Sequence, residues 1–351
     1  MCNISFIITT FNSENHIRTT VNNIKCQSGC ALYRNDVEVL FIDDGSSDAT
    51  PNILRDSFLD YDNVRIIRND QNQGAGYSRN IGLEHASGRY VLFLDCDDIY
   101  HPDMFDLCAR LASCIDIDIL FYKSVRVDLR INIESGVHYP IFDKFKAGEI
   151  FSACDIREHV LNSATWWSWD RLIRREFING QNIRFQEIRS SEDLFFNASL
   201  FMLADKISYI DNFLIHHVDN RSGSVSNSRE KSFDCCILAV EKVKEFLLEK
   251  NLYFSRRVDF FDYIIGFLNW HLESINGNAY FPLFDMVKKY LLENIDGLDG
   301  IRPENRETYA LISKTQSFEY LSYLKSKFYL EREVYKITNE YLRKNLKGEN
   351  G

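Results

Sequence analysis

The sequence predicts an α/β protein with a mainly parallel sheet flanked by helices and a helical extension at the C-terminus. Three observations carry this prediction. In residues 1–100, short apolar runs alternate with single amphipathic segments. Three of these apolar runs end in a cluster of polar or acidic side chains. From about residue 229 onward, apolar residues recur at helical spacing. Strands joined by single helices form parallel sheets with helices on their faces.

The first hundred residues contain four runs that we interpret as buried strands. They lie at 4–9, 37–42, 64–67 and 90–94, and the first is continuously apolar, as expected for a strand with both faces covered. The segments between them read as helices. We expect one helix to begin at 12–14, a second to follow the acidic turn at 43–48, and a third over 77–86, after a polar, glycine-bearing loop at 69–76.

After residue 100, the alternation of apolar runs and amphipathic segments is less regular. We expect a strand at 115–122, followed by an aromatic segment at 166–169. Ser190 or Ser191 is placed to cap a helix that continues through residue 201. Residues 212–228 are polar, and we expect them to be irregular. Helices follow from residue 229, including a long one near the C-terminus, with Pro303 separating the helical pieces.

Composition and charge narrow the class of protein. Of the 351 residues, 45% are hydrophobic, so a sizeable core is available. The net charge of −10 argues against a protein that binds nucleic acid, and we expect no nucleic-acid partner. No basic segment precedes the first apolar run, and no run approaches the roughly 18 apolar residues of a membrane span. The nine scattered cysteines favour reduced thiols. We therefore expect a cytoplasmic protein.

The strand at 90–94 runs directly into three carboxylates, Asp95, Asp97 and Asp98. A buried strand seldom ends on this much negative charge unless a cation binds there. Because side chains alternate along an extended segment, Asp95 and Asp97 point to the same side. Carboxylate oxygens suit Mg²⁺ or Mn²⁺ bound together with substrate phosphates. The cluster therefore predicts a metal site for a phosphate-bearing substrate.

Further polar groups are expected near this cluster, because open parallel sheets bind ligands at the carboxyl ends of their strands. Asp43 and Asp44, at a neighbouring strand end, can accept hydrogen bonds from a base or a ribose. A bound cation would neutralise charge that grows on a departing diphosphate. A carboxylate of Glu192 or Asp193 can serve as a general base. These groups together fit a nucleotide-diphosphate donor.

Five motifs occur in a fixed order along the chain. They lie at residues 7–12, 41–48, 72–83, 88–98 and 192–193. In this order they resemble the motifs of glycosyltransferase family 2, whose members are inverting enzymes with a GT-A fold, and the resemblance covers roughly residues 3–225. It implies a catalytic domain over 1–228, with a nucleotide-binding half (1–100) and an acceptor-binding half (101–228), and a helical region over 229–351.

The resemblance implies roles for individual residues at the donor site. Thr9, Asn12 and Asp44 are expected to line the nucleotide pocket, with Asp44 at the uracil or the ribose. Arg79 is expected near the diphosphate or the sugar. Asp95 is expected near the ribose or the sugar.

The resemblance also implies the reaction. Asp97 is expected to be the principal ligand of Mn²⁺ or Mg²⁺, and Asp193 the base that deprotonates the acceptor hydroxyl. A hexose or N-acetylhexosamine would pass from a UDP-sugar to a saccharide acceptor in a single displacement with inversion. The acceptor would be lipid-linked, in bacterial surface polysaccharide synthesis at the inner face of the plasma membrane.

For several residues, the sequence is compatible with a functional role and with a structural role. Trp166, Trp167 and Trp169 can stack on an acceptor sugar, or they can fill the core as aromatic residues usually do. Glu192 is placed with them at the acceptor site, although an acidic residue in a first helical turn also complements the helix dipole. The sequence alone does not decide between the two roles for any of these residues.

A histidine pair and one arginine also allow both a functional and a structural role. His216 and His217 stand where family members often carry tyrosines. His217 is a candidate metal ligand, and a structural histidine is the competing interpretation. Arg221 is a candidate for a diphosphate contact, because arginine clamps on phosphate recur in proteins, or it is an exposed loop charge.

Two other functions compete with this hypothesis. A nucleotidyltransferase shares parallel-sheet nucleotide pockets, but it needs a loop rich in glycine and arginine after the first strand, where residues 9–12 lack both. A non-catalytic carbohydrate-binding or scaffold protein with a decayed site would not need the acidic groups present here. The C-terminal helices mix aromatic and basic residues, so they can contact an anionic membrane surface, or pack on the catalytic domain or in a homodimer.

Overall fold

One mixed sheet forms the N-terminal part of the protein. The computed structural model describes residues 2–128, 133–219, 229–275 and 277–346, with the backbone alone at residue 30 and over 332–346. The strand order is β3-β2-β1-β4-β8-β6-β9-β5, and β7 pairs with β6. The strands are β1 (Ile4–Thr10), β2 (Val37–Asp43), β3 (Val64–Arg68), β4 (Tyr90–Asp95), β5 (Ile99–Tyr100), β6 (Ile119–Asp128), β7 (Ile133–Gly136), β8 (Arg171–Arg174) and β9 (Ile207–Asp219).

The first four strands are parallel to one another, as the sequence predicts. The connecting helices cover both faces of the sheet, and adjacent residues of β1 show why. Phe6 stacks on Phe105 of α4 with ring centroids 3.7 Å apart. The next residue, Ile7, points to the opposite face, where a Cβ on Gly82 of α3 would lie 2.3 Å from its side chain. The helices of this part are α1 (Ile17–Lys25), α2 (Thr50–Ser57), α3 (Ala75–His85), α4 (Met104–Cys114), α5 (Ile141–Lys144), α6 (Arg175–Gln181), α7 (Glu192–Leu203) and α8 (Cys235–Glu249).

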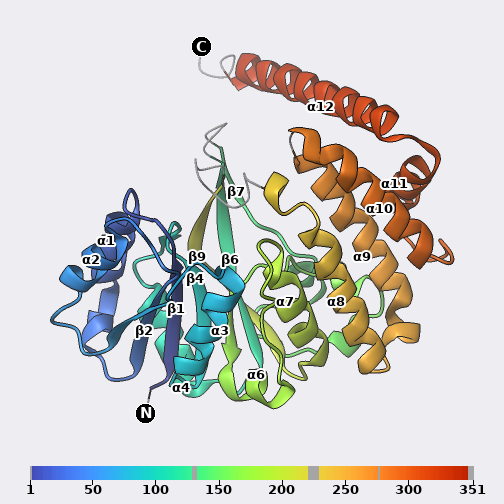
Figure 1. Ribbon diagram of the computed structural model, residues 1–351. Helices are drawn as coiled ribbons and strands as arrows, with labels where there is room; N and C mark the ends of the chain where they lie inside the picture. The colour runs from blue at the N-terminus through green and yellow to red at the C-terminus, as the bar shows by residue number, and fades with distance from the viewer. Residues whose placement is uncertain (1, 129–132, 220–228, 276, 347–351) are drawn as a thin grey trace. The chain divides into compact units, whose positions relative to one another are not determined.

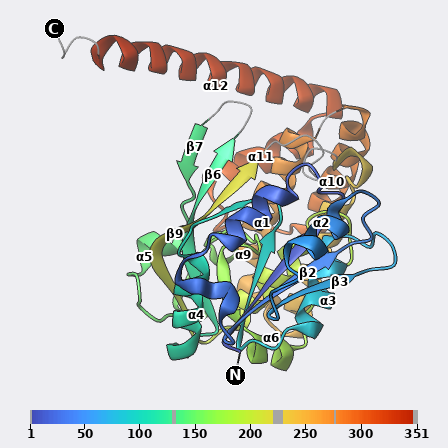
Figure 2. The ribbon, with the colours of Figure 1, turned by 90° about the vertical axis from the view of Figure 1, so that its left-hand side faces the viewer.

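The second half of the sheet departs from the expectation at one segment. Residues 212–219 were expected to be irregular, but they belong to β9, which runs parallel to β6 and antiparallel to β5. Main-chain hydrogen bonds to two neighbours stabilise a strand whatever the polarity of its side chains. Figures 1 and 2 show β6 and β9 side by side, with β7 along β6. Residues 220–228 lie outside the described residues.

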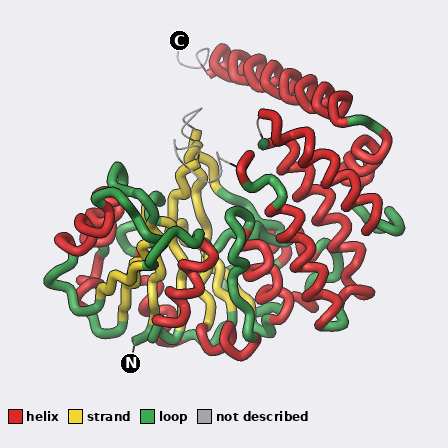
Figure 3. Tube along the Cα trace, viewed as in Figure 1, coloured by secondary structure: helices red, strands yellow, loops and turns green. Residues whose placement is uncertain are grey.

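The chain divides into two compact units, Met1–Phe260 and Phe261–Gly351. The expected domain boundary at 228/229 stays a prediction. Figure 3 shows helices joined by loops, and no strand, in the described residues after β9. No helix of the described residues is long and apolar enough to cross a membrane. The helices beyond α8 are α9 (Tyr253–Ser274), α10 (Tyr280–Asn294), α11 (Pro303–Lys314) and α12 (Ser317–Leu346).

The second unit has its own buried contacts. Asp262 of α9 is fully buried and accepts hydrogen bonds from the Arg302 backbone N (3.0 Å) and from Asn305 Nδ2 (2.9 Å), which ties α9 to α11. Tyr320 of α12 packs on Phe284 of α10 with ring centroids 5.6 Å apart. These contacts confirm that the C-terminal region is helical, as predicted.

Candidate functional site

The loops after β1 and β2 are joined to each other at the carboxyl edge of the sheet. Asn12 Oδ1 accepts a hydrogen bond from the Ser47 backbone N (2.9 Å), and the Asn12 backbone N donates to Ser46 Oγ (2.9 Å). Asn12 has φ 45°, a left-handed conformation that asparagine tolerates better than most residues. Thr9 lies opposite Asp95 in the register of β1 and β4, which brings these two predicted residues together.

Asp44 is buried and organises the loop that leads into α3. Its carboxylate accepts hydrogen bonds from Asn69 Nδ2 (2.8 Å) and from the backbone N of Gln73 (3.0 Å) and Gly74 (2.7 Å). Gly74 has φ 96° and immediately precedes the first residue of α3. The predicted contact of Asp44 with uracil or ribose stays a prediction, and the structure adds that Asp44 shapes this loop.

Arg79 of α3 connects two other predicted residues. Its guanidinium donates to Asp95 Oδ1 (2.9 Å) at the end of β4 and to Glu192 Oε1 (2.6 Å) at the start of α7. Burial alone would lower the pKa of Arg79, but the carboxylates of Asp95, Glu192 and Asp193 raise it above its ordinary value. Arg79 therefore stays charged, and it holds the Glu192 carboxylate that was predicted to contact the acceptor.

Asp193 lies in the first turn of α7, next to this ion-pair cluster. The helix begins after Ser191, one of the two serines predicted to cap it. Ser191 has φ 61°, and its side chain makes no capping hydrogen bond, so the predicted side-chain cap is wrong. Burial and the neighbouring charge of Glu192 raise the pKa of Asp193 to about 7, although Arg79 opposes the shift. A carboxylate with a pKa near neutrality is suited to accept a proton.

Asp98 turns away from the helix that follows it and contacts β9. Its fully buried carboxylate lies 3.0 Å from His217 Nδ1 and accepts from the Val218 backbone N (3.1 Å). His217 Nε2 faces Asp219 Oδ1 at 3.3 Å. Burial would lower the pKa of His217, but Asp98 and Asp219 raise it well above its ordinary value. His217 would have to give up one of these partners to bind a metal as predicted.

The three tryptophans occupy different environments. Trp166 is buried at 4% exposure and its indole donates to the Leu161 carbonyl (3.1 Å), so its assignment to the acceptor site is corrected to a core residue. Trp169 is also buried, and it stacks on His217 with centroids 4.7 Å apart. Trp167 stacks on Trp169 and is partly exposed, so it alone of the three presents an accessible ring surface.

The donor set fits a divalent cation only if the substrate completes it. Among the described residues, no three His, Cys, Asp or Glu side chains gather as a metal cluster. Asp95 pairs with Arg79, and Asp98 faces His217. Asp97 lies between them and is partly exposed. Mg²⁺ commonly binds through one or two carboxylates together with substrate phosphates, which suits this arrangement.

Two residues that hold the site together were given no role in the sequence analysis. Asn80 and Asp219 each bond to a segment distant in the chain, so no local pattern marks them, although Asn80 directly follows Arg79 in one of the five motifs. Asp98 was predicted as part of the acidic cluster, but its bonds to β9 were not. Arg221 lies outside the described residues.

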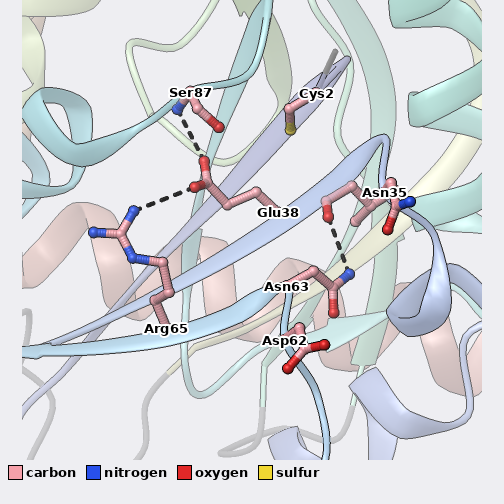
Figure 4. Close-up of a pocket in the computed structure, with 8 residues that line it drawn as sticks. Cys2, Asn35, Glu38, Asp62, Asn63, Arg65 and Ser87 are labelled. Atoms are coloured by element: carbon pink, nitrogen blue, oxygen red, sulfur yellow. Dashed lines mark hydrogen bonds and ion pairs between the residues drawn. The ribbon is translucent and has the colours of Figure 1, made fainter.

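A small hollow lies at the opposite, amino edge of the sheet and is unrelated to this cluster. It has a volume of about 220 Å³ and is lined by residues that include Glu38, Asn63 and Arg65. Figure 4 shows Glu38 bonded to Ser87 and Arg65, and Asn63 bonded to a neighbouring backbone oxygen. These polar groups satisfy one another, which is typical of a structural network.

Comparison with known proteins gives matches along the N-terminal part of the chain. The family model described as "Glycosyl transferase family 2" matches residues 5–136. EpsH of Bacillus subtilis, named as a glycosyltransferase, is 27% identical over 71% of this chain and 70% of its own length. The cholesterol galactosyltransferase of Borreliella burgdorferi is 29% identical over 64% of this chain and 62% of its own.

A similar fold is found in a solved structure. The crystal structure of S. aureus TarS 1–349 in complex with UDP-GlcNAc has a TM-score of 0.58 and 20% sequence identity, and the match covers 90% of this chain and 91% of that one. At this identity the likeness concerns the fold. The α/β arrangement with a mainly parallel N-terminal sheet and C-terminal helices is thus shared with a known structure.

Proposed function

We propose that the chain is a glycosyltransferase of family 2 with a GT-A fold, and that it transfers a hexose or N-acetylhexosamine from a UDP-sugar to a hydroxyl of a saccharide acceptor, with inversion. The observation that carries the proposal is the position of Asp193. It lies beside the Arg79, Asp95 and Glu192 cluster at the carboxyl edge of the sheet, and its pKa is about 7. The names of similar proteins support the UDP-sugar donor and the saccharide acceptor.

Two of these names concern the donor and the setting. TarS, a poly(ribitol-phosphate) beta-N-acetylglucosaminyltransferase of Staphylococcus aureus, is 27% identical to this chain over 232 residues. Its N-terminal part has been solved with UDP-GlcNAc and with UDP. These relatives support a UDP-sugar donor and a place in bacterial surface polysaccharide synthesis, with a lipid-linked saccharide as the proposed acceptor.

In the proposed reaction, Asp193 accepts the proton of the acceptor hydroxyl. The acceptor oxygen forms a bond to the anomeric carbon from the face opposite the UDP group. The bond between that carbon and the diphosphate oxygen breaks, and UDP leaves with the electron pair. One displacement of this kind inverts the anomeric configuration. A base with a pKa near the working pH is effective because it is ionised and still accepts protons well.

The other residues orient the groups around this step. Arg79 fixes the Asp95 and Glu192 carboxylates by ion pairs at 2.9 and 2.6 Å. Asp44 and Asn12 hold the loops that we propose to contact the nucleotide, together with Thr9. Trp167 offers a partly exposed indole on which a sugar ring of the acceptor can stack.

Mn²⁺ or Mg²⁺ is the proposed cofactor, with Asp97 as the principal ligand. When bound there with the donor's phosphates, the cation would neutralise negative charge on the leaving diphosphate. The acidic composition of the 95–98 segment and its exposure at Asp97 support this assignment. Contact of the C-terminal helices with a membrane or a second copy of the chain stays a prediction.

The proposal is tested by removing the proton acceptor. Asp193→Asn keeps the shape of the side chain but cannot take a proton at neutral pH, so kcat should fall by about 10²-fold or more. The affinity for UDP in the presence of Mn²⁺ should stay unchanged, because Asp193 contacts the acceptor. Steady-state rates of UDP release and calorimetric titration with UDP measure the two quantities.

A matched control replaces an exposed acidic residue of the same segment. Glu187→Gln removes one charge five residues before the cluster begins, and it should leave kcat unchanged. Full turnover by Asp193→Asn would remove this residue from the mechanism. A parallel loss of UDP affinity would instead place it at the donor.

A further inference from the structure

Helix α3, which carries Arg79, makes a second connection to the segment before α7. The side-chain amide of the next residue, Asn80, is bonded at both of its polar atoms to the backbone of Phe185. Asn80 Oδ1 accepts from the Phe185 N (2.9 Å), and Asn80 Nδ2 donates to the Phe185 carbonyl (3.0 Å). Asn80 is 7% exposed and Phe185 is 3% exposed, so water does not compete for these groups. The pair of bonds fixes both the position and the orientation of the peptide at residue 185.

The ring of Phe185 transmits this position to the helix that carries the proposed base. It stacks on Phe196 of α7, with centroids 3.8 Å apart and planes 15° from parallel. Its neighbour on the sheet side is Phe93 of β4, in an edge contact at 4.9 Å. Phe185 is thus held by Asn80 through its backbone and by β4 and α7 through its ring. A shift of its backbone must move α7, because close-packed rings transmit displacement.

Helix α3 and the segment before α7 approach so closely that no side chain fits between them at one point. A Cβ on Gly76 of α3 would lie 2.0 Å from the Gln186 carbonyl oxygen and 3.2 Å from the Glu192 side chain. Gly74, the residue immediately before α3, donates its backbone N–H to the Asp44 carboxylate (2.7 Å). Helix α3 therefore connects the loop that Asp44 organises with residues 185–192 and the start of α7.

We propose that Asn80 is a positioning residue for Asp193, acting through Phe185 and α7. This inference rests on the proposed function and deepens it. Asn80 contacts neither of the proposed substrates, since both polar atoms of its side chain are engaged by Phe185. Its substitution should misplace the proton acceptor without disturbing the donor site, and a misplacement of about 1 Å can lower a rate by about 10²-fold.

The test compares two asparagines that each bond to the backbone of a segment distant in the chain. Asn80→Ala in the full chain should lower kcat by about 10- to 100-fold, with the Kd for UDP in the presence of Mn²⁺ within about twofold of wild type. Asn63→Ala is the matched control. Asn63 Nδ2 donates to the carbonyls of Val37 (3.0 Å) and Arg34 (3.4 Å) beside the hollow of Figure 4. It should lower the melting temperature and leave kcat unchanged.

A second measurement follows the segment itself. Hydrogen exchange of peptides that cover residues 183–193 should be faster in Asn80→Ala than in wild type, and unchanged in Asn63→Ala. If Asn80→Ala does not fold, Asn80→Asp is used in its place. The aspartate keeps the acceptor for the Phe185 N and loses the donor to its carbonyl, so the same fall in kcat is expected.

The outcomes separate this inference from the proposed function. A wild-type kcat in Asn80→Ala, or an equal loss in Asn63→Ala, overturns the positioning role while the transferase activity stands. A large loss of UDP affinity in Asn80→Ala overturns it as well, because the residue would then act on the donor side. If the wild-type protein transfers no sugar from any UDP-sugar, the proposed function fails and the positioning role fails with it.

Discussion

Asp193, the proposed base, owes its raised pKa to its surroundings. An aspartate in water has a pKa near 4, at which it is a weak proton acceptor. Burial at the start of α7 and the charge of Glu192 raise the pKa of Asp193 to about 7, while Arg79 limits the shift. Arg79 thus has two effects: it fixes the Glu192 carboxylate, and its charge limits how far the pKa of Asp193 rises.

This environment predicts the pH dependence of turnover. Asp193 must be ionised to accept a proton, so kcat should rise about tenfold per pH unit below 7 and level off above it. Glu192→Gln removes a charge that raises the pKa of Asp193, so the midpoint should move to lower pH. The measurement is kcat at saturating donor between pH 5 and 9. A flat profile below pH 7, or an unchanged midpoint in Glu192→Gln, would contradict the assigned base.

Individual site residues were predictable where they belong to a local pattern. Asp95, Asp97 and Asp193 follow a strand or open a helix, so their place at the carboxyl edge could be argued from the sequence. The partners of these residues could not. Arg79 and Glu192 are 113 positions apart, and Asn80 and Phe185 are 105 positions apart. Only the folded chain brings such pairs together.

At the scale of the element, α3 is defined by its close contact with residues 185–192. Helices rarely approach a neighbouring backbone this closely unless a glycine provides the space. Gly76 supplies it, since a Cβ there would lie 2.0 Å from the Gln186 carbonyl oxygen. Gly180 of α6 is a glycine of the opposite kind, because a Cβ there would meet nothing within 4 Å.

The two glycines predict opposite effects on stability. Gly76→Ala should lower the free energy of unfolding by about 1–3 kcal/mol, since backbone must move to admit the methyl group. Gly180→Ala should be neutral or raise it by up to about 1 kcal/mol, because alanine loses less entropy in a helix. Urea unfolding of the full chain, followed by circular dichroism, measures both. Equal stability of the two variants would contradict the close contact described for α3.

The same scale shows where periodicity fails as a guide. The strands β1, β2 and β4 are buried on both faces, so their mainly apolar sequences predict them. The last part of β9 is polar and only partly buried, and its main-chain bonds to β6 and β5 were invisible in the sequence. The start of the first helix was placed too early for a related reason. Asn12 bonds to the loop after β2, so α1 begins only at Ile17.

At the scale of the whole molecule, groups from the parallel strands and from helix α7 lie at one edge of the sheet. The parallel strands β1, β2 and β4 bring Thr9, Asp44 and Asp95 to that edge, and α7 brings Asp193 beside them. The sequence predicted this convergence from topology alone, because the carboxyl ends of parallel strands meet on one side. It could not separate the core tryptophans from the accessible one, since that depends on how the segment 166–169 packs.

The account depends on inverting transfer from a UDP-sugar at this edge. Its most direct test is to follow UDP-α-sugars by ¹H NMR during transfer to water, with Mn²⁺ or Mg²⁺ present and after its removal by EDTA. We expect UDP to be released only with the metal, and the free sugar to appear first as the β anomer. Release of the α anomer first, or equal turnover after EDTA treatment, would contradict the account.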